Sequence, residues 1–405
     1  MLLYWIWFAQ LNKITALQKQ TLLRHFADPE EIYHNDGSLV RQIEELPESV
    51  AEALEDKDLT QAQQIMQECA DKGIGIITLG DSNYPHRLRN TADPPLVLYF
   101  KGQLPMWDLQ PVVGIVGTRK ASPYGLNTAG RFGKQIAACG ALVVSGGAVG
   151  IDTMAMKGAL EAGRPVVGVL GCGVDVVYPA QNRQLFEQVV QNGCLISEYP
   201  PRTKGLAWHF PERNRIITGI SNGLLVVEAP ERSGAMISAR HAMEQGRDVF
   251  AVPGNVDVES CAGSNALLQD QAIPALSGWD VVKEYAGRWP GVVSKQVVFY
   301  DKTPETMVAQ TVEVPAQPKI DKPHADKKAI DKEEKSTYSV ELEKKRAALS
   351  EDERTVLALI GREPLSVDEV IAGADMSAST VKGILTRLMI KGMTVNHPGG
   401  RVSLK

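Results

Sequence analysis

Short apolar runs that alternate with amphipathic stretches fill the sequence between residues 111 and 285, and this pattern limits the possible folds most strongly. The runs are Val112–Val116, Leu142–Ser145, Val166–Leu170, Leu224–Glu228 and Asp248–Val252, with a weaker one at Cys194–Ser197. Runs that are apolar along their whole length are typical of strands buried on both faces. Because helical stretches separate them, they predict an α/β fold with a Rossmann-like, doubly wound and mostly parallel sheet. Such a sheet places ligands beyond the carboxyl ends of its strands.

Length and local pattern divide the chain into domains. At 405 residues the chain is longer than one core ordinarily supports, so we expect several domains. Residues 1–72 repeat apolar side chains at helical spacing, which predicts a small all-α domain of the SAM or helix-hairpin-helix kind. Residues 73–285 are assigned to the Rossmann-like domain with its lead-in segment, in which Ile74–Ile77 and Leu96–Tyr99 are predicted strands.

The remaining residues predict a linker and a third domain. Residues 286–345 lose the apolar periodicity and are rich in Lys, Asp, Glu, Pro and Gln, so we predict a flexible linker. In residues 346–405, capping boxes at Ser350–Glu353 and Ser366–Glu369 predict two helix starts, and Ser377 predicts a third. The apolar stripe of the third helix consists of Val381, Ile384, Leu385, Leu388 and Met389. A hairpin pattern follows this helix, and the set predicts a winged helix.

Composition excludes several classes of protein. The formal net charge of -5 argues against a surface covered in basic residues and leaves a local basic groove open. Five widely spaced cysteines, without a Cys-x-x-Cys pair or a histidine cluster, predict buried free thiols and no metal site. The apolar run Leu2–Ala9 is far shorter than the ~20 residues of a membrane span and lacks the flanks of a signal peptide. We therefore expect a buried first helix in a cytoplasmic protein.

A glycine turn follows the first strand of the predicted sheet. Gly114 and Gly117 flank the end of this strand, and Arg119 and Lys120 come just before a helix that starts near Pro123. Backbone N–H groups in such a turn approach anions, and the next helix N-terminus adds a favourable dipole. The turn therefore predicts a phosphate contact, although strand-to-helix turns need glycine for packing as often as for ligands.

A second glycine turn ends the next predicted strand. It contains Ser145, Gly146 and Gly147, with Asp152 at the start of the following helix. Two such turns on neighbouring strands would line one rim of the sheet with amides, a more specific signal than either turn alone. No Gly-Lys-Ser/Thr follows and no carboxylate is placed for an NAD ribose, so we expect no nucleotide cofactor.

A third motif places cations beside aromatic rings. Around a predicted helix start, Trp208 and Phe210 precede Arg213, Asn214 and Arg215. Aromatic faces next to guanidinium groups suit sequence-tolerant binding of a single nucleic-acid strand. The alternative is an arginine pair tied to internal carboxylates with the Trp208 ring in the core, and the motif alone does not decide between them.

Together these motifs resemble the family of DNA-processing protein A (DprA, also called Smf). The shared motifs are Gly114-x-x-Gly117-x-Arg119, Ser145-Gly-Gly-Ala-x-Gly-Ile-Asp152, Gly171-x-Gly173-x-Asp175, Tyr178-Pro179, Ser197-Glu198-Tyr199-Pro200, Phe210-Pro-x-Arg213-Asn-Arg215, Val227-Glu228-Ala229, Ser233-Gly234 and Val252-Pro253-Gly254. Their occurrence in one order over a long stretch makes chance similarity implausible.

The resemblance implies a protein of natural transformation and homologous recombination. It would bind and protect incoming single-stranded DNA, form a homodimer through the Rossmann-like domain and help to load RecA recombinase, with no catalytic residue. The residues implied to contact DNA are Gly114, Gly117, Arg119, Lys120, Ser145, Gly146, Gly147, Phe210, Arg213, Asn214 and Arg215. Among them, Arg119 is implied to clamp a phosphate and Phe210 to stack on a base.

Two other functions stay open at this stage. Related Rossmann-like folds include phosphoribohydrolases, and Asp152 and Glu228 stand where catalytic carboxylates are often found. The Pro-Gly-Gly-x-Gly-Thr signature of those enzymes is missing, however. The structural alternatives are a helix cap for Asp152 and a partner of a buried arginine for Glu228. The winged helix would also suit a transcription regulator, but its third helix offers only Lys382, Arg387 and Lys391 as cations.

Overall fold

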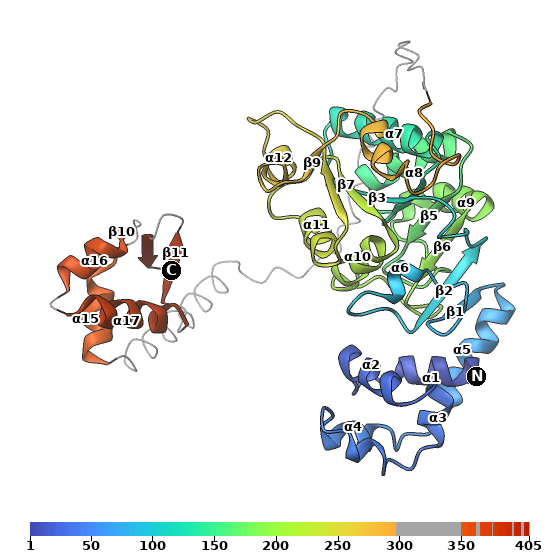
Figure 1. The fold of residues 1–405 in the computed structure, drawn as a ribbon, viewed down its shortest axis with the longest axis horizontal. Coiled ribbons are helices and arrows are strands. Elements are labelled where there is room, and N and C mark those ends of the chain that lie inside the picture. Colours follow the sequence, from blue (N-terminus) through green and yellow to red (C-terminus); the bar gives the residue numbers. More distant parts are fainter. Residues whose placement is uncertain (297–349, 362–364, 375, 391–392, 398–400, 405) are drawn as a thin grey trace, which may run out of the picture. The chain divides into compact units, whose positions relative to one another are not determined.

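The computed structural model describes residues 1–296, 350–361, 365–374, 376–390, 393–397 and 401–404. The chain divides into two compact units, residues 1–301 and 302–405. A large sheet with helices on both faces forms the centre of the first unit (Figure 1).

The sheet of the first unit has nine strands in the order β1-β2-β6-β5-β4-β3-β7-β8-β9. Its strands are β1 (Gly75–Thr78), β2 (Val97–Gly102), β3 (Val112–Val116), β4 (Leu142–Ser145), β5 (Val166–Val169), β6 (Cys194–Ser197), β7 (Gly223–Val226), β8 (Asp248–Ala251) and β9 (Ile273–Pro274). Strands β3 to β9 pair in parallel, and only the pairs β1–β2 and β2–β6 are antiparallel. The mostly parallel sheet is thus confirmed, and the predicted lead-in segment supplies two of its strands.

Successive residues of a strand point to opposite faces of the sheet. Both faces of this sheet carry apolar side chains, so helices cover both of them. Val113 and Ile115 pack under one set, and Val112 and Val116 under the other. The first set is α7 (Pro123–Ala138), α8 (Ile151–Glu161), α9 (Arg183–Asn192) and α13 (Gly278–Val282). The second set is α6 (His86–Arg89), α10 (His209–Ile220), α11 (Gly234–Glu244) and α12 (Ala262–Gln269). Short 3-10 turns occur at Val40–Gln42, Ala180–Asn182, Glu259–Cys261 and Lys283–Tyr285.

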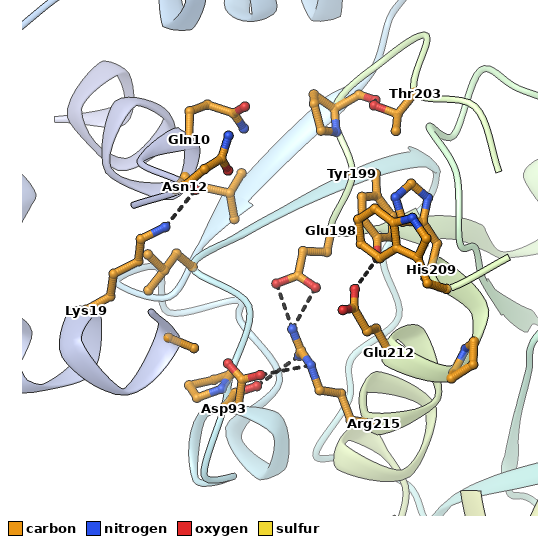
Figure 2. Close-up of a pocket in the computed structure, with 18 of the residues that line it drawn as sticks. Gln10, Asn12, Lys19, Asp93, Glu198, Tyr199, Thr203, His209, Glu212 and Arg215 are labelled. Carbon is orange, nitrogen blue, oxygen red and sulfur yellow. Dashed lines mark hydrogen bonds and ion pairs between the residues drawn. The ribbon is translucent and has the colours of Figure 1, made fainter. Parts of the chain in front are cut away.

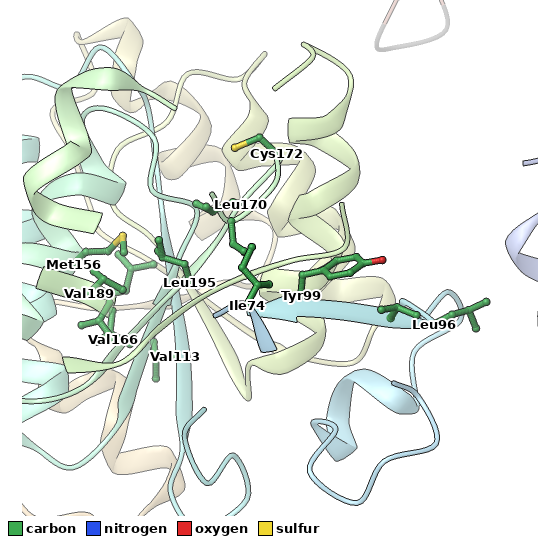
Figure 3. Packing of buried hydrophobic residues seen from close by; sticks show 14 of the residues in the cluster. Ile74, Leu96, Tyr99, Val113, Met156, Val166, Leu170, Cys172, Val189 and Leu195 are labelled. Atoms are coloured by element: carbon green, nitrogen blue, oxygen red, sulfur yellow. The ribbon is translucent and has the colours of Figure 1, made fainter. Parts of the chain in front are cut away.

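The N-terminal residues are helical, as predicted, and they share a core with the sheet. Their helices are α1 (Leu2–Gln10), α2 (Ala16–His25), α3 (Pro29–His34), α4 (Glu48–Ala53) and α5 (Thr60–Asp71). Trp5 and Phe8 of α1 belong to the same buried cluster as Leu96 and Tyr99 beside and within β2, part of which Figure 3 shows. An ion pair of 2.5 Å from Lys72 Nζ to Asp175 Oδ2 adds a polar link.

Residues 286–296, predicted as the start of the linker, instead pack on the first unit. The Trp289 Nε1 group donates to the Asp108 carbonyl oxygen at 3.1 Å, and the side chains of Trp289 and Val293 are buried. The rest of the predicted linker, up to residue 345, lies outside the described residues. The five cysteines are all described, and each is buried and unpaired, as expected. Among the described helices, none combines the length and the apolar character of a membrane span.

The second unit contains the predicted winged helix. Its helices are α15 (Glu351–Leu359), α16 (Val367–Gly373) and α17 (Ala378–Ile390), and its strands β10 (Leu365–Ser366), β11 (Thr394–His397) and β12 (Arg401–Leu404) pair in the order β10-β12-β11. Both predicted capping boxes are present, and the Ser377 hydroxyl accepts a hydrogen bond from the Thr380 amide. The predicted stripe on α17 is buried at Val381, Ile384, Leu385 and Leu388, whereas the side chain of Met389 is not described.

Candidate nucleic-acid interface

A pocket of about 470 Å³ lies beyond the carboxyl ends of β3 and β7. Strand order reverses between these two strands, because β4, β5 and β6 lie on one side of β3 and β7, β8 and β9 on the other. Ligands of doubly wound sheets bind at this reversal point. The predicted residues that line the pocket are Gly117, Arg119, Lys120, Phe210, Arg213 and Asn214.

The turn between β3 and α7 is held in place by backbone contacts. The Thr118 amide donates to the Glu228 carbonyl oxygen at 2.7 Å, and a Cβ atom on Gly117 would stand 2.5 Å from Ile151 Cγ1. Only glycine fits this approach. Beyond it, the side chains of Arg119 and Lys120 are exposed at the rim of the pocket.

Glu228 closes the base of this turn rather than pairing with a buried arginine. Its carboxylate accepts from the Ser122 hydroxyl at 2.7 Å and from the Ser122 amide at 3.1 Å, and the residue is fully buried. The Ser122 hydroxyl in turn accepts from the Gly125 amide at 3.0 Å and caps α7. Glu228 therefore orients the first turn of α7, and the predicted role as a partner of a buried arginine is wrong.

Phe210 places an aromatic ring beside the cation of Arg119. The Arg119 guanidinium carbon lies 5.2 Å from the Phe210 ring centroid, and the Tyr178 ring lies 5.2 Å away at a tilt of 32°. Phe210 is half-buried, and Tyr178 is 46% exposed. Trp208 is 56% exposed, so the alternative that its ring belongs to the core is wrong.

The second glycine turn does not offer a row of free amides. Ser145 is fully buried, and its hydroxyl donates to the Ile115 carbonyl oxygen at 2.7 Å. Gly146 and Gly147 are also buried. The Ala148 amide donates to Asp152 Oδ2 at 3.3 Å, so the turn holds an internal carboxylate where an external phosphate was predicted. Direct DNA contacts by Ser145, Gly146 and Gly147 are thus corrected to structural roles.

Arg213 is likewise an internal cation. Only 3% of the residue is exposed, and its Nη1 group donates to the Gly146 carbonyl oxygen at 2.6 Å and to the Val169 carbonyl oxygen. A Cβ atom on Gly146 would stand 2.6 Å from Arg213 Nη2 and 2.7 Å from Asp152 Oδ2, which shows how closely the two side chains lie against this turn. Arg213 therefore fixes the floor of the pocket.

Gly114 and Arg215 lie away from the rim, which corrects their predicted DNA contacts. Gly114 pairs within β3 with Val144 and Leu224 and is enclosed by the sheet. Figure 2 shows Arg215 in a separate cavity, where its Nη2 group donates to both oxygens of Glu198 at 2.7 and 2.8 Å. Its Nε atom lies 3.1 Å from Asp93 Oδ2. The alternative of an arginine tied to internal carboxylates thus holds for Arg215.

Arg232 is a rim residue that the sequence analysis missed. It is exposed, lines the pocket and precedes Ser233, whose hydroxyl accepts from the Met236 amide at 3.4 Å and caps α11. The N-terminus of α11 thus borders the pocket, where its amides and dipole favour an anion. The available sequence signal for Arg232 was its position directly before a helix-capping serine that follows a predicted strand. Asn214 binds to this cap, because its Nδ2 group donates to the Gly234 carbonyl oxygen at 3.2 Å.

Among the described residues that line this pocket, Asp152 has a pKa that is shifted toward neutral pH. Burial raises the pKa of Asp152 to about 6, from an ordinary value of 3.8, and the opposing attraction of Arg213 only limits the rise. Folding therefore favours the protonated carboxyl. Its contribution to stability is fully present below about pH 4 and is lost as pH rises through about 6.

We expect the Asp152→Asn variant to lose this part of the pH dependence. Between pH 4 and 7 the free energy of unfolding of the natural chain should fall by about 3 kcal/mol relative to the variant, at ~1.4 kcal/mol per pKa unit. Urea unfolding of both proteins at several pH values measures the difference. Parallel pH profiles would show that folding does not raise the pKa of Asp152.

Comparison with known proteins agrees with this architecture. Residues 75–286 match the family described as DNA recombination-mediator protein A, and residues 341–400 match the DprA winged helix domain. The first match spans more than half of the chain. The chain belongs to the DNA recombination-mediator protein A family.

Relatives of this family extend over most of the chain. Protein Smf of Synechocystis sp. is 29% identical over 98% of this chain and 97% of its own length. The DNA processing protein DprA of Bacillus subtilis is 38% identical over 56% of this chain and 76% of its own length. The X-ray structure of DprA from Streptococcus pneumoniae superposes with a TM-score of 0.62 and 31% identity, covering 70% of this chain and 98% of that one. The predicted fold class and family are therefore confirmed.

Proposed function

We propose that this chain binds single-stranded DNA at the pocket beyond β3 and β7 and acts in the cytoplasm during natural transformation. One observation carries the proposal. At the reversal point of the sheet, the exposed cation of Arg119 lies 5.2 Å from the half-buried ring of Phe210, and within the described residues Arg119 has no ion pair. An exposed guanidinium and a half-buried aromatic ring at one rim match the two parts of a nucleotide, its phosphate and its base.

The rim suits a single strand better than a duplex. Arg119, Lys120 and Arg232 bring positive charge to a pocket of about 470 Å³, and Phe210 offers an aromatic surface within it. A base reaches such a surface only when it is unstacked, as bases are in a single strand. Binding that depends on stacking and phosphate contacts tolerates many sequences, as a DNA-processing protein requires.

The proposal includes protection of incoming DNA, help in loading RecA recombinase, and a homodimer formed through the Rossmann-like domain. The description of the family as a recombination mediator supports the role in recombination. For the dimer, exposed apolar side chains follow the last two strands of the sheet order, Val256 (85%) after β8 and Leu276 (71%) after β9. Light scattering on the purified chain should give twice the monomer mass, and a RecA filament assay on coated DNA tests the mediator role.

We infer that the chain catalyses no reaction on nucleotides. Glu228 is fully buried and bonded to Ser122, so it presents no free carboxylate to the pocket. Asp152 lines the pocket but is only 6% exposed and lies against Arg213.

The regulator alternative also finds little support, because Arg387, the predicted α17 cation whose side chain is described, forms an ion pair with Glu353 at 3.4 Å.

Fluorescence anisotropy with a labelled oligo-dT strand tests the proposal. Binding at two salt concentrations should be tight for the strand, weaker for a duplex of the same length, and reduced by salt. The same sample is tested for release of base or phosphate from nucleotides. Turnover of a nucleotide without strand binding would contradict the proposal and favour a hydrolase that uses Asp152.

The Phe210→Ala variant should bind the strand more weakly by about 1–3 kcal/mol, the value of one stacked base. Phe210→Tyr keeps an aromatic face and should retain most of the affinity. Anisotropy titrations measure both, and circular dichroism checks that both variants are folded. Equal affinity of a folded Phe210→Ala protein would show that the ring only packs against Tyr178.

A further inference from the structure

Three arginines from separate segments meet at the opposite end of the sheet. A pocket of about 340 Å³ lies at the amino ends of β7 and β8, lined by Arg87 of α6, Arg247 before β8, and Arg288 after the last 3-10 turn of the first unit. Asn222, just before β7, also lines it. Because β7 and β8 run in parallel, this pocket and the candidate DNA rim lie at opposite ends of these strands.

The arginines of this pocket are incompletely bonded. Arg87 is 7% exposed, and its Nη1 group lies 3.1 Å from Asp108 Oδ1, but its Nε and Nη2 groups have no partner among the described residues. The Arg247 Nη2 group donates to the carbonyl oxygens of Arg87 and Gly219 at 3.0 Å each, and its Nε group is also without a described partner. Buried donors without acceptors are costly, so such groups call for an explanation.

The charges of the pocket favour an anion. Burial lowers the pKa of Arg87, Asp108 opposes this, and the neighbouring charges of Arg288 and Arg247 lower it further. Three guanidinium groups line the pocket against one lining carboxylate, that of Asp248, and Arg87 also forms an ion pair with Asp108. Asp248 Oδ2 already accepts a hydrogen bond from the Tyr285 hydroxyl at 2.9 Å. An added anion would relieve the repulsion among the arginines.

The aromatic residues of this region indicate which part of a nucleotide would fit. The Trp289 ring is 8% exposed and has the guanidinium carbons of Arg87 and Arg288 at 5.7 and 4.8 Å from its centroid. Tyr285 is 7% exposed. Both rings are buried, so neither is accessible to a base, whereas Phe210 at the DNA rim is half-buried.

We propose that this arginine pocket binds a phosphate group, carried by inorganic phosphate, by a nucleoside monophosphate or by the end of a nucleic-acid strand. Guanidinium groups form paired, charge-assisted hydrogen bonds with phosphate oxygens, and the side-chain amides of Asn90, Asn222 and Gln245 add further polar groups to the lining. The site stands independently of DNA binding at Arg119. The opposing explanation is that the arginines only clamp α6 to the sheet through backbone carbonyls.

Calorimetric titration of the full chain with inorganic phosphate separates these explanations. The measurement is made on the Arg119→Ala variant, so that the DNA rim contributes less to phosphate binding. Arg288 is exposed, so adding Arg288→Ala should leave the fold intact and weaken phosphate binding about tenfold. Adding Arg247→Lys, which keeps the charge but not the forked donor, should also weaken it, whereas the exposed Arg164→Ala serves as a matched control without effect.

Competition identifies the source of the phosphate. A strand with a 5′-phosphate that displaces inorganic phosphate, when the same strand with a 5′-hydroxyl does not, assigns the pocket to strand ends. Displacement by a nucleoside monophosphate alone assigns it to a free nucleotide, and both results support the site. Absence of phosphate binding by the Arg119→Ala chain, or equal binding after Arg288→Ala, would overturn the proposal whatever the chain does with single-stranded DNA.

Discussion

Replacement of Arg119 by alanine is expected to weaken binding of a DNA single strand by about ten- to a hundredfold, the value of one hydrogen bond to a charged group. Arg119 is exposed at the pocket rim and lies over Phe210, so the variant removes the proposed phosphate contact without opening a cavity. The slope of log affinity against log salt should fall by about 0.7, since one fewer counterion is released from a single strand.

Two controls define this result. Arg119→Lys keeps the charge but loses the forked donor, and it should fall between the natural chain and the alanine variant. Arg164→Ala removes an exposed arginine elsewhere and should bind normally. Anisotropy titrations at several salt concentrations measure all three proteins. If Arg119→Ala is folded and binds like the natural chain, the pocket beyond β3 is not the DNA site.

The Arg215→Met variant is expected to lose about 3–5 kcal/mol of the free energy of unfolding. Arg215 is 16% exposed and donates to both oxygens of Glu198. Burial raises the pKa of Glu198, and Arg215 opposes this rise. Without the arginine, the carboxylates of Glu198 and Asp93 face each other unpaired. Urea denaturation at neutral pH measures the loss.

Addition of Glu198→Gln to this variant should recover part of the stability, because it removes one of the unpaired charges. Where the Arg215→Met protein is still folded, its affinity for a single strand should stay within about twofold, since Arg215 does not line the candidate DNA pocket. A large loss of affinity at unchanged stability would restore Arg215 as a DNA contact.

The strands were predictable because burial on both faces leaves a visible record of continuous apolar residues. The contacts of polar residues were less predictable than the strands, since these contacts depend on segments that are distant in the sequence. Arg213 and Arg215 are two residues apart on α10, and such residues do not share a helix face. One therefore points to the Gly146 turn and the other to Glu198, a division that the spacing alone does not reveal.

The glycine turns show the same limit. A glycine-rich turn before a helix has amides suited to an anion, but the sequence does not say whether that anion is a ligand or a side chain of the protein. In the second turn it is Asp152, four residues after Ala148. In the first, Glu228 occupies the start of α7 through Ser122 and leaves Arg119 and Lys120 free at the rim.

The cluster that joins the N-terminal helices to the sheet has a consequence for how the protein melts. Trp5, Phe8, Leu96 and Tyr99 belong to one buried cluster, so the loss of α1 would expose apolar surface on the sheet side as well. Residues 1–301 should then give one calorimetric transition, with equal van't Hoff and measured enthalpies, whereas residues 302–405 give another. A fragment that lacks the first 72 residues is accordingly a poor substitute for the whole chain in binding assays.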